Sequence, residues 1–137
     1  MKNNFINKIT KRGFFHQCTN NDELANLLNS KSIKAYIGFD CTAPSLHVGS
    51  LMQIMCLRLL QRYGHQPIVL LGGGTTLIGD PSGKDSTRKI LDEKAINNNI
   101  KKIKKIFEKL LNFNNKKTTP IFVNNAEWLN KLKYIEF

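Results

Sequence analysis

The chain has 137 residues, 41% of them hydrophobic, and a formal net charge of +11 at pH 7. This length suits a single domain, and the hydrophobic content is high enough for a packed core and too high for a disordered chain. No apolar run approaches the roughly 18 residues of a spanning helix, and the first residues lack the apolar stretch of a secretory signal. We therefore expect a cytoplasmic protein with no membrane segment, whose positive charge favours polyanionic partners.

The cysteines exclude two further classes of protein. Cys18, Cys41 and Cys56 lie far apart and form no Cys-x-x-Cys pair. An odd number of cysteines without such a pattern argues against a disulfide framework and against a zinc site. We therefore predict no metal site.

The first part of the chain is predicted to form two helices and a strand. Phe5–Lys11 places its apolar side chains on one side of a short helix. Asn21 or Asp22 could cap a second helix that runs through Leu28. Lys34–Phe39 is predicted to be a strand. The inward face of the second helix is expected to consist of Leu24, Leu27 and Leu28.

A strongly apolar segment follows a proline turn at residues 40–44. Leu46–Tyr63 is apolar on most sides, which predicts a largely buried helix, and Gly64 is placed to end it. Pro67–Leu71 is a short continuous apolar run, which is typical of a buried parallel strand. Gly72–Lys84 is rich in glycine and is predicted to be a loop.

The remainder of the chain alternates in the same way. Leu91–Leu111 is an amphipathic helix with a lysine-rich outer face, Ile121–Val123 a short strand, and Ala126–Phe137 a helical pattern. This alternation predicts an α/β fold, a Rossmann-like parallel sheet with flanking helices. Ligands bind such sheets beyond the carboxyl ends of the strands. Those ends are expected at Gly38–Ser45, Gly72–Lys84 and Asn124–Asn125.

The segment that opens the apolar helix has the character of an anion site. Gly49 lies in the first helical turn, where a glycine costs about 1 kcal/mol relative to alanine, and a flat ligand near the backbone would explain it. His47 lies beside the free N–H groups and the positive end of the helix, which favour phosphate. On its own, His47 is more simply explained as a cap of the helix or a surface histidine.

The glycine-rich segment matches neither the P-loop nor the dinucleotide fingerprint. Asp80 follows a strand end, where its carboxylate could face an amine. Lys84 and Arg88 lie four residues apart and could reach one anionic group. An ordinary β-turn with Asp80 at its first position is the alternative interpretation.

Three segments together resemble tyrosyl-tRNA synthetases, which are class I enzymes. Tyr36–Ser50 resembles the first signature of this family, and Gly64–Lys84 and Asn124–Leu129 resemble later landmarks in the same order and spacing. The Asp-Pro-Ser-Gly-Lys motif at residues 80–84 favours the tyrosine enzymes over their tryptophan relatives. The likeness is dense over residues 36–88 and thinner elsewhere.

The resemblance implies a two-step ligase. L-tyrosine would react with ATP, which carries Mg²⁺, to give tyrosyl-adenylate and pyrophosphate, and the tyrosyl group would pass to tRNA(Tyr). Thr42 and His47 would contact the outer phosphate, and Lys84 and Arg88 would steady the pyrophosphate, so catalysis would consist of alignment and charge stabilisation. Gly49 would leave room for adenine.

The same resemblance assigns the tyrosine contacts. Tyr36 would hydrogen-bond the phenolic hydroxyl and Asp80 would receive the ammonium group, with Gly38 and Asp40 also at the substrate. Ser50 stands where the family usually has a second histidine, so it is kept only as a possible ATP-binding residue.

The family members are several hundred residues long and form homodimers. Residues 1–137 would therefore be the amino-terminal part of the catalytic domain, incomplete at its carboxyl end, and are not expected to charge tRNA alone. Two alternatives are a small basic RNA-binding module and a nucleotide-binding relic without ligase activity. The first of these would use a lysine face formed by Lys101, Lys102, Lys105 and Lys109.

Overall fold

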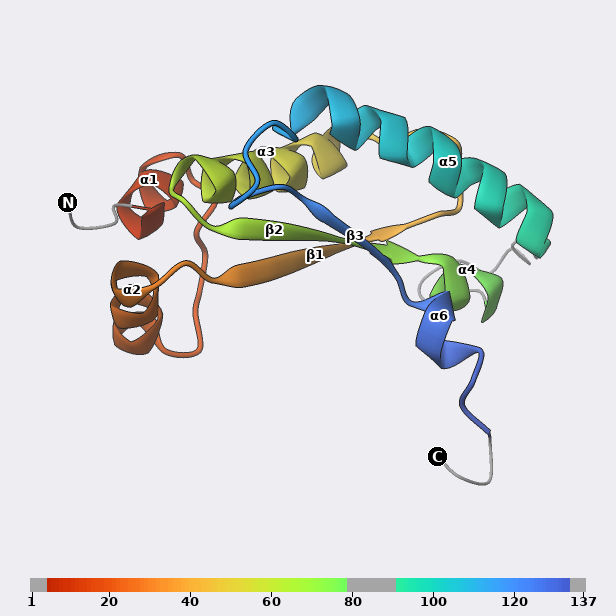
Figure 1. The fold of residues 1–137 in the computed structure, drawn as a ribbon, viewed down its shortest axis with the longest axis horizontal. Helices are drawn as coiled ribbons and strands as arrows, with labels where there is room; N and C mark the ends of the chain where they lie inside the picture. Colours follow the sequence, from red (N-terminus) through yellow and green to blue (C-terminus); the bar gives the residue numbers. More distant parts are fainter. Residues whose placement is uncertain (1–4, 79–90, 134–137) are drawn as a thin grey trace.

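The apolar segments of the chain assemble into a parallel sheet in the computed structural model, which describes residues 5–78 and 91–133. β2 lies between β1 and β3, and all strands run parallel (Figure 1). The three predicted strands are confirmed, each one or two residues longer than expected, and so is the α/β fold class. The elements are α1 (Phe5–Lys11), α2 (Asn21–Ser30), β1 (Lys34–Asp40), α3 (Val48–Arg62), β2 (Gln66–Gly72), α4 (Gly73–Ile78), α5 (Glu93–Leu110), β3 (Ile121–Asn124) and α6 (Ala126–Leu129).

The main core lies between the sheet and the helices α3 and α5, which cover one of its faces (Figure 1). Parallel strands need crossover connections. Here the crossovers run through α3 and α5, and the apolar sides of these helices pack on the sheet. Phe107 of α5 is fully buried, with its ring centroid 4.8 Å from that of Phe39 and 6.0 Å from that of Phe122. A second, smaller cluster of buried residues joins α1, α2 and α3 through Phe5, Ile9, Leu28, Leu59 and Leu60.

The opposite face of β1 is open to solvent. Ala35, Ile37 and Phe39 point toward the helices, whereas the residues between them are exposed. A strand with alternating burial has one face in the core and one in water. The exposed positions are Lys34, Tyr36, Gly38 and Asp40.

Two details of the N-terminal half differ from the prediction. Asn20, and not Asn21 or Asp22, caps α2, because its side chain accepts a hydrogen bond from the N–H of Glu23 at 3.1 Å while its amide donates to the Glu23 carboxylate. Leu27 is 36% exposed, so only Leu24 and Leu28 of the expected apolar face pack inward.

The apolar helix α3 is less buried than expected. Gly64 does end it, with a φ of 85°, a backbone conformation that glycine adopts at little cost. Its first turns, however, leave Val48, Leu51 and Met52 between 43% and 85% exposed. These side chains project away from the described core, so apolar character on all sides did not mean burial on all sides.

Two further predictions fail after β2 and β3. Gly73–Ile78, expected to be loop, forms the helix α4, and the helical pattern after Ala126 ends at Leu129 as α6. None of the helices in the described ranges is both long and apolar enough to cross a membrane.

Candidate active site

The loops that carry the predicted site residues leave the sheet at one edge. Asp40, the last residue of β1, lies opposite Gly72 of β2, and Leu71 lies opposite Asn124 of β3. The carboxyl ends of the three strands are therefore neighbours, as the sequence predicted. The predicted residues Asp80, Lys84 and Arg88 lie outside the described residues.

Three predicted substrate residues share the open face of β1. Tyr36, Gly38 and Asp40 alternate along the strand and are all exposed, with Tyr36 at 67%. A Cβ at Gly38 would meet nothing closer than the Leu70 Cδ2 atom at 4.0 Å, so internal packing does not require glycine there. A glycine in a strand interior with no packing reason is typical of a place where a ligand approaches the backbone.

The end of β2 is shaped around the Asp40 carboxylate. A Cβ on Gly72 would lie 3.3 Å from Asp40 Oδ1 and 2.8 Å from the Thr75 hydroxyl. Only a residue without a side chain lets the carboxylate and the start of α4 approach the strand this closely. Gly72 therefore has an internal steric reason that the sequence did not reveal.

His47 caps α3 with its ring. The Nδ1 atom accepts a hydrogen bond from the N–H of Gly49 at 3.1 Å, and Nε2 lies 3.5 Å from the hydroxyl of Ser50. This is the capping role that the sequence left open as the simpler explanation. A Cβ on Gly49 would lie 2.8 Å from His47 Cε1, so the ring itself accounts for this glycine.

The residues that form this cap differ in their exposure to solvent. His47 and Gly49 are exposed, whereas Ser50 is 6% exposed and turns its hydroxyl toward the histidine ring. Ser50 is thus placed to orient the ring, and contact between Ser50 and ATP stays a prediction.

The loop after β1 is anchored at Cys41. Its N–H donates to the Thr76 hydroxyl at 3.1 Å, and its carbonyl accepts from the Asn99 side chain at 2.9 Å. Burial raises the pKa of the Cys41 thiol to about 11, so this side chain is protonated at neutral pH and is no nucleophile. The anchored backbone holds the next residue, Thr42, in an exposed position.

Two asparagines attach α4 to the end of β3. Asn124 Oδ1 accepts from the N–H groups of Gly73 and Ala126 at 3.2 and 3.1 Å. Asn125 Oδ1 accepts from the N–H of Gly74 at 2.8 Å, and its amide donates to the Thr75 hydroxyl at 3.1 Å. These side chains satisfy donors at the start of α4 that the helix itself leaves without partners.

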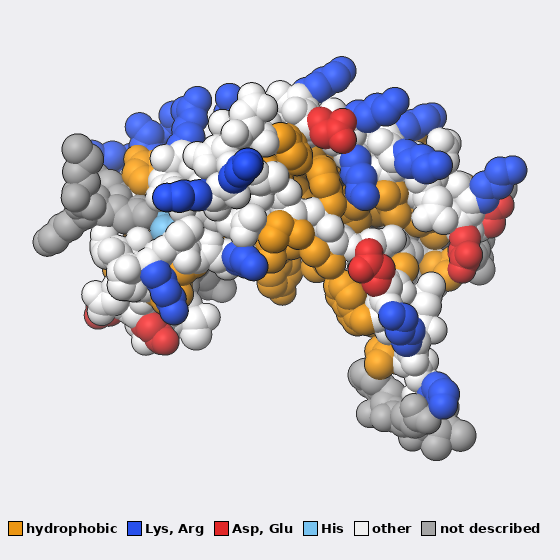
Figure 2. Space-filling view, viewed as in Figure 1, with side chains coloured by type: hydrophobic (Ala, Val, Ile, Leu, Met, Phe, Trp, Pro, Cys, Tyr) orange, Lys and Arg blue, Asp and Glu red, His pale blue; other side chains and the backbone are white. Residues whose placement is uncertain are grey.

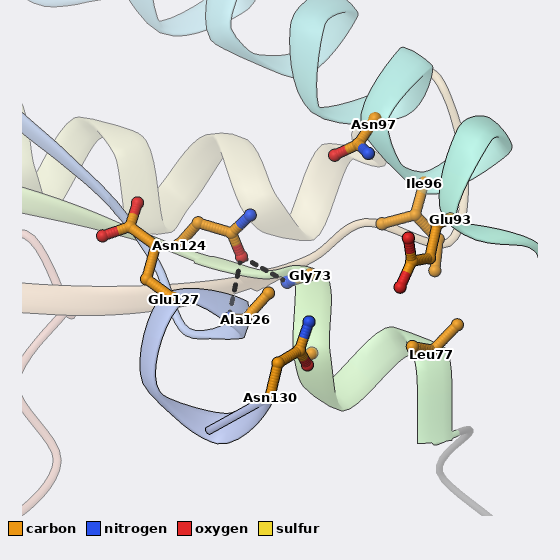
Figure 3. A pocket seen from close by; sticks show the side chains of 10 residues that line it. Gly73, Leu77, Glu93, Ile96, Asn97, Asn124, Ala126, Glu127 and Asn130 are labelled. Carbon is orange, nitrogen blue, oxygen red and sulfur yellow. Dashed lines mark hydrogen bonds between the residues drawn. The ribbon is translucent and has the colours of Figure 1, made fainter. Parts of the chain in front are cut away.

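A cavity of about 270 Å³ opens between α4, α5 and α6 (Figure 3). Leu77 and Glu93 lie on one side of it, and Asn124 and Glu127 on the other. None of the predicted site residues that the structure describes lines this cavity. Its lining comprises Gly73, Gly74, Leu77, Glu93, Ile96, Asn97, Asn124, Ala126, Glu127 and Asn130.

The sequence did not reveal the anchoring roles of Thr76, Asn99 and Asn125, although Asn125 was expected at a strand end. Only Asn99 carries a signal, because it is a buried polar side chain among Ile96, Ile100 and Ile103 on the apolar side of α5. Within residues 5–78 and 91–133, no group of three or more His, Cys, Asp and Glu side chains is arranged to hold a metal ion.

The fold is that of part of a class I synthetase domain, and comparison with known proteins identifies the family. Residues 28–137 match the family described as tRNA synthetases class I (W and Y). The chain therefore belongs to this family.

Within it, the relatives are tyrosine enzymes. The chain is 62% identical over 135 residues to a tyrosine–tRNA ligase of Pelagibacter ubique and 60% identical over 137 residues to one of Wolbachia pipientis from Culex pipiens. These matches cover 98% and 99% of this chain and 33% of each relative, so the chain spans about a third of their length.

Solved structures give the same likeness. The mitochondrial tyrosyl-tRNA synthetase of Aspergillus nidulans, truncated at its C-terminus, superposes with a TM-score of 0.76 at 25% identity, over 96% of this chain and 40% of that one. The corresponding Coccidioides posadasii structure gives 0.74 at 30% identity, over 96% and 38% of the two chains. The chain is thus a homologue of tyrosyl-tRNA synthetases over almost its whole length.

Proposed function

We propose that this chain carries the part of a tyrosine–tRNA ligase that binds ATP and L-tyrosine at the carboxyl edge of its sheet. The observation that supports this most directly is the open face of β1, where Tyr36, Gly38 and Asp40 stand together and exposed. Gly38 has no internal packing reason, which leaves room for a ligand on that face. The 62% identity of the chain to a tyrosine–tRNA ligase supports tyrosine as the amino acid.

The chemistry follows from the groups available. The tyrosine carboxylate attacks the α-phosphate of ATP, the bond to pyrophosphate breaks, and tyrosyl-adenylate forms before the tyrosyl group passes to tRNA(Tyr). His47 and Thr42 meet the phosphates beside the positive end of α3, where developing negative charge is stabilised. By family likeness, Lys84 and Arg88 stabilise the pyrophosphate, and Asp80 receives the substrate ammonium group.

Three further properties belong to the same proposal. Mg²⁺ arrives bound to ATP as part of the substrate. The working enzyme is a homodimer, as in the family, and it acts in the cytoplasm.

These 137 residues alone are not expected to charge tRNA. Tyr36 is 67% exposed, so a substrate bound beside it would remain in contact with water on the open face. Hydrogen bonds and charges act most strongly in sites from which water is excluded. Full activity therefore needs further polypeptide over this face, of the kind that makes the relatives three times longer.

A chimera tests the proposal. This chain replaces the aligned third of the Pelagibacter ubique relative, and tyrosine-dependent exchange of pyrophosphate into ATP is measured. We expect exchange with tyrosine and a loss of about a hundredfold on His47→Asn, because asparagine keeps the cap of α3 but removes the ring. His16→Asn, at an exposed histidine in the segment between α1 and α2, is the matched control and should leave the rate unchanged.

A folded chimera without tyrosine-dependent exchange, or a His47→Asn chimera as active as the unmodified one, would refute the assignment. Should the chimera not fold, equilibrium dialysis of the 137-residue chain with ATP and L-tyrosine decides. Binding of ATP that tyrosine does not influence would favour the relic without ligase activity.

A further inference from the structure

A second cavity lies at the far end of α3 from His47. It has a volume of about 390 Å³ and opens between the last turns of α3 and the segment that follows α5. α3 has 15 residues, and at 1.5 Å per residue such a helix is about 22 Å long, so this cavity is remote from the candidate active site. It is lined by Arg58, Gln61, Arg62, Asn112, Asn115 and Thr118, which we call the α3 end pocket.

The walls of this pocket are fixed by hydrogen bonds between distant parts of the chain. The buried Gln61 amide donates to the carbonyls of Asn112 at 2.8 Å and Thr118 at 2.7 Å, and its oxygen accepts from the N–H of Asn112 at 3.0 Å. Arg58 donates to the carbonyl of Leu110 at the end of α5. The pocket is therefore formed before any ligand binds.

The polar groups left over in the pocket are mostly donors. Asn112 Oδ1 already accepts from the N–H of Asn114 at 2.8 Å, and Asn115 Oδ1 from the N–H of Lys117 at 3.0 Å. Their amide NH₂ groups remain, together with the guanidinium of the exposed Arg62 and the further N–H groups of Arg58. A ligand that satisfies such a set must offer acceptors.

The charge of the pocket selects an anion. Arg58 and Arg62 lie one helical turn apart, and none of the described residues that line the cavity is acidic. The ends of α3 and α5 each contribute about half a negative charge, which the two arginines more than offset. Lys116 and Lys117 are exposed in the adjoining segment. Figure 2 shows Lys and Arg side chains spread along the edge of the molecule formed by α3 and α5, with fewer Asp and Glu among them.

We propose that the α3 end pocket binds a phosphate group. Two guanidinium groups and two amides offer the forked donor geometry that phosphate oxygens accept, and arginine is the residue best suited to it. The phosphate comes either from a free phosphate or from the backbone of an RNA strand. This site does not depend on the proposed ligase activity.

NMR titration of the isotopically labelled 137-residue chain tests the site. Inorganic phosphate, pyrophosphate and a short single-stranded oligouridylate are added in turn, and the amide signals of residues 112–118 and the guanidinium signals of Arg58 and Arg62 are followed. We expect saturable shifts of these groups, whether or not other signals shift near His47, and binding at the pocket about tenfold weaker in Arg62→Gln. Lys131→Gln removes an exposed charge beyond α6 and should leave the affinity unchanged.

The two phosphate sources give different results. If RNA is the ligand, oligouridylate binds more tightly than inorganic phosphate, and Arg62→Gln lowers its salt slope by about one. If a free phosphate is the ligand, phosphate or pyrophosphate binds at least as tightly as the oligonucleotide.

A second variant covers the case in which Arg62→Gln perturbs the fold. Asn115→Asp keeps the acceptor for the N–H of Lys117 but replaces an amide donor by a carboxylate, and it should abolish binding. Non-saturating shifts of residues 112–118, no shifts of these residues, or equal weakening by Arg62→Gln and Lys131→Gln would overturn the proposal. In that event the role of the two arginines is only to stabilise the carboxyl ends of α3 and α5.

Discussion

The attachment of α4 to β3 predicts a large effect of Asn125→Ala. Asn125 is 8% exposed, and its side chain makes two hydrogen bonds to α4, from the buried N–H of Gly74 and to the Thr75 hydroxyl. Removing the side chain leaves a buried donor without its partner, which costs about 1–3 kcal/mol, and the second hydrogen bond adds about 1 kcal/mol. We expect a loss of about 2–4 kcal/mol in the free energy of unfolding, measured by urea denaturation with an unchanged m-value.

Asn130→Ala is the matched control, because Asn130 is an asparagine at the other end of α6 and is exposed. It should change the free energy of unfolding by no more than about 0.5 kcal/mol. Asn125→Asp keeps the acceptor for the N–H of Gly74 but loses the donor to Thr75. Its loss in free energy of unfolding should therefore lie between those of Asn125→Ala and Asn130→Ala. If Asn125→Ala were no less stable than Asn130→Ala, the idea that Asn125 holds α4 on the sheet would have to be abandoned.

Two predictions concern buried titratable groups. The pKa of the Cys41 thiol is about 11 in the fold against 9.0 ordinarily. The unfolded chain therefore loses this proton first, and the free energy of unfolding should fall as pH rises from 9.0 to about 11, a slope that Cys41→Ala should reduce in urea denaturation at several pH values. An equal slope in both proteins would contradict the burial argument. Burial also lowers the pKa of His65, whose Nδ1 accepts from the N–H of Ile33 at 3.3 Å. The unfolded chain then binds the proton more readily, so stability should fall as pH drops below about 6.5, and thermal melts of His65→Asn should show a smaller fall. If the stability of His65→Asn fell by the same amount, the pH dependence would have to come from other titratable groups.

Periodicity predicted most of the framework because the elements concerned are governed by burial along one face. The spacing of Ile96, Ile100, Ile103 and Phe107 predicted α5, and the apolar run at 67–71 predicted the central strand. Both elements contribute to the main core, so their local pattern and their tertiary environment agree.

Tertiary contacts decided the elements that were missed. Two glycines at the start of α4 disfavour a helix, yet Asn124 and Asn125, about 50 residues away, satisfy its first N–H groups. No local pattern reports such a contact. The same reason hid the anchoring of Cys41, whose partners lie 35 and 58 residues away in the chain.

The family resemblance, and not a local pattern, assigned Tyr36 and Asp40 to the candidate site. The structure extends β1 to Asp40, and the alternation along the strand places both residues on its exposed face. The geometry around His47 was not predictable, because a histidine ring can either cap a helix or face a ligand, and only the position of the Gly49 N–H distinguishes the two.

The exposure of Tyr36 has a consequence for the choice between tyrosine and phenylalanine. Tyr36 is 67% exposed, so its hydroxyl can bond to water whenever a substrate offers it no partner. Bound phenylalanine would then leave no polar group of the protein without a hydrogen-bond partner. The free-energy difference between binding of tyrosine and of phenylalanine would be much smaller than in a site without water. If Tyr36 contacts the substrate as proposed, discrimination against phenylalanine depends on how completely water is excluded from this strand face, and the exposed phenol alone does not provide it.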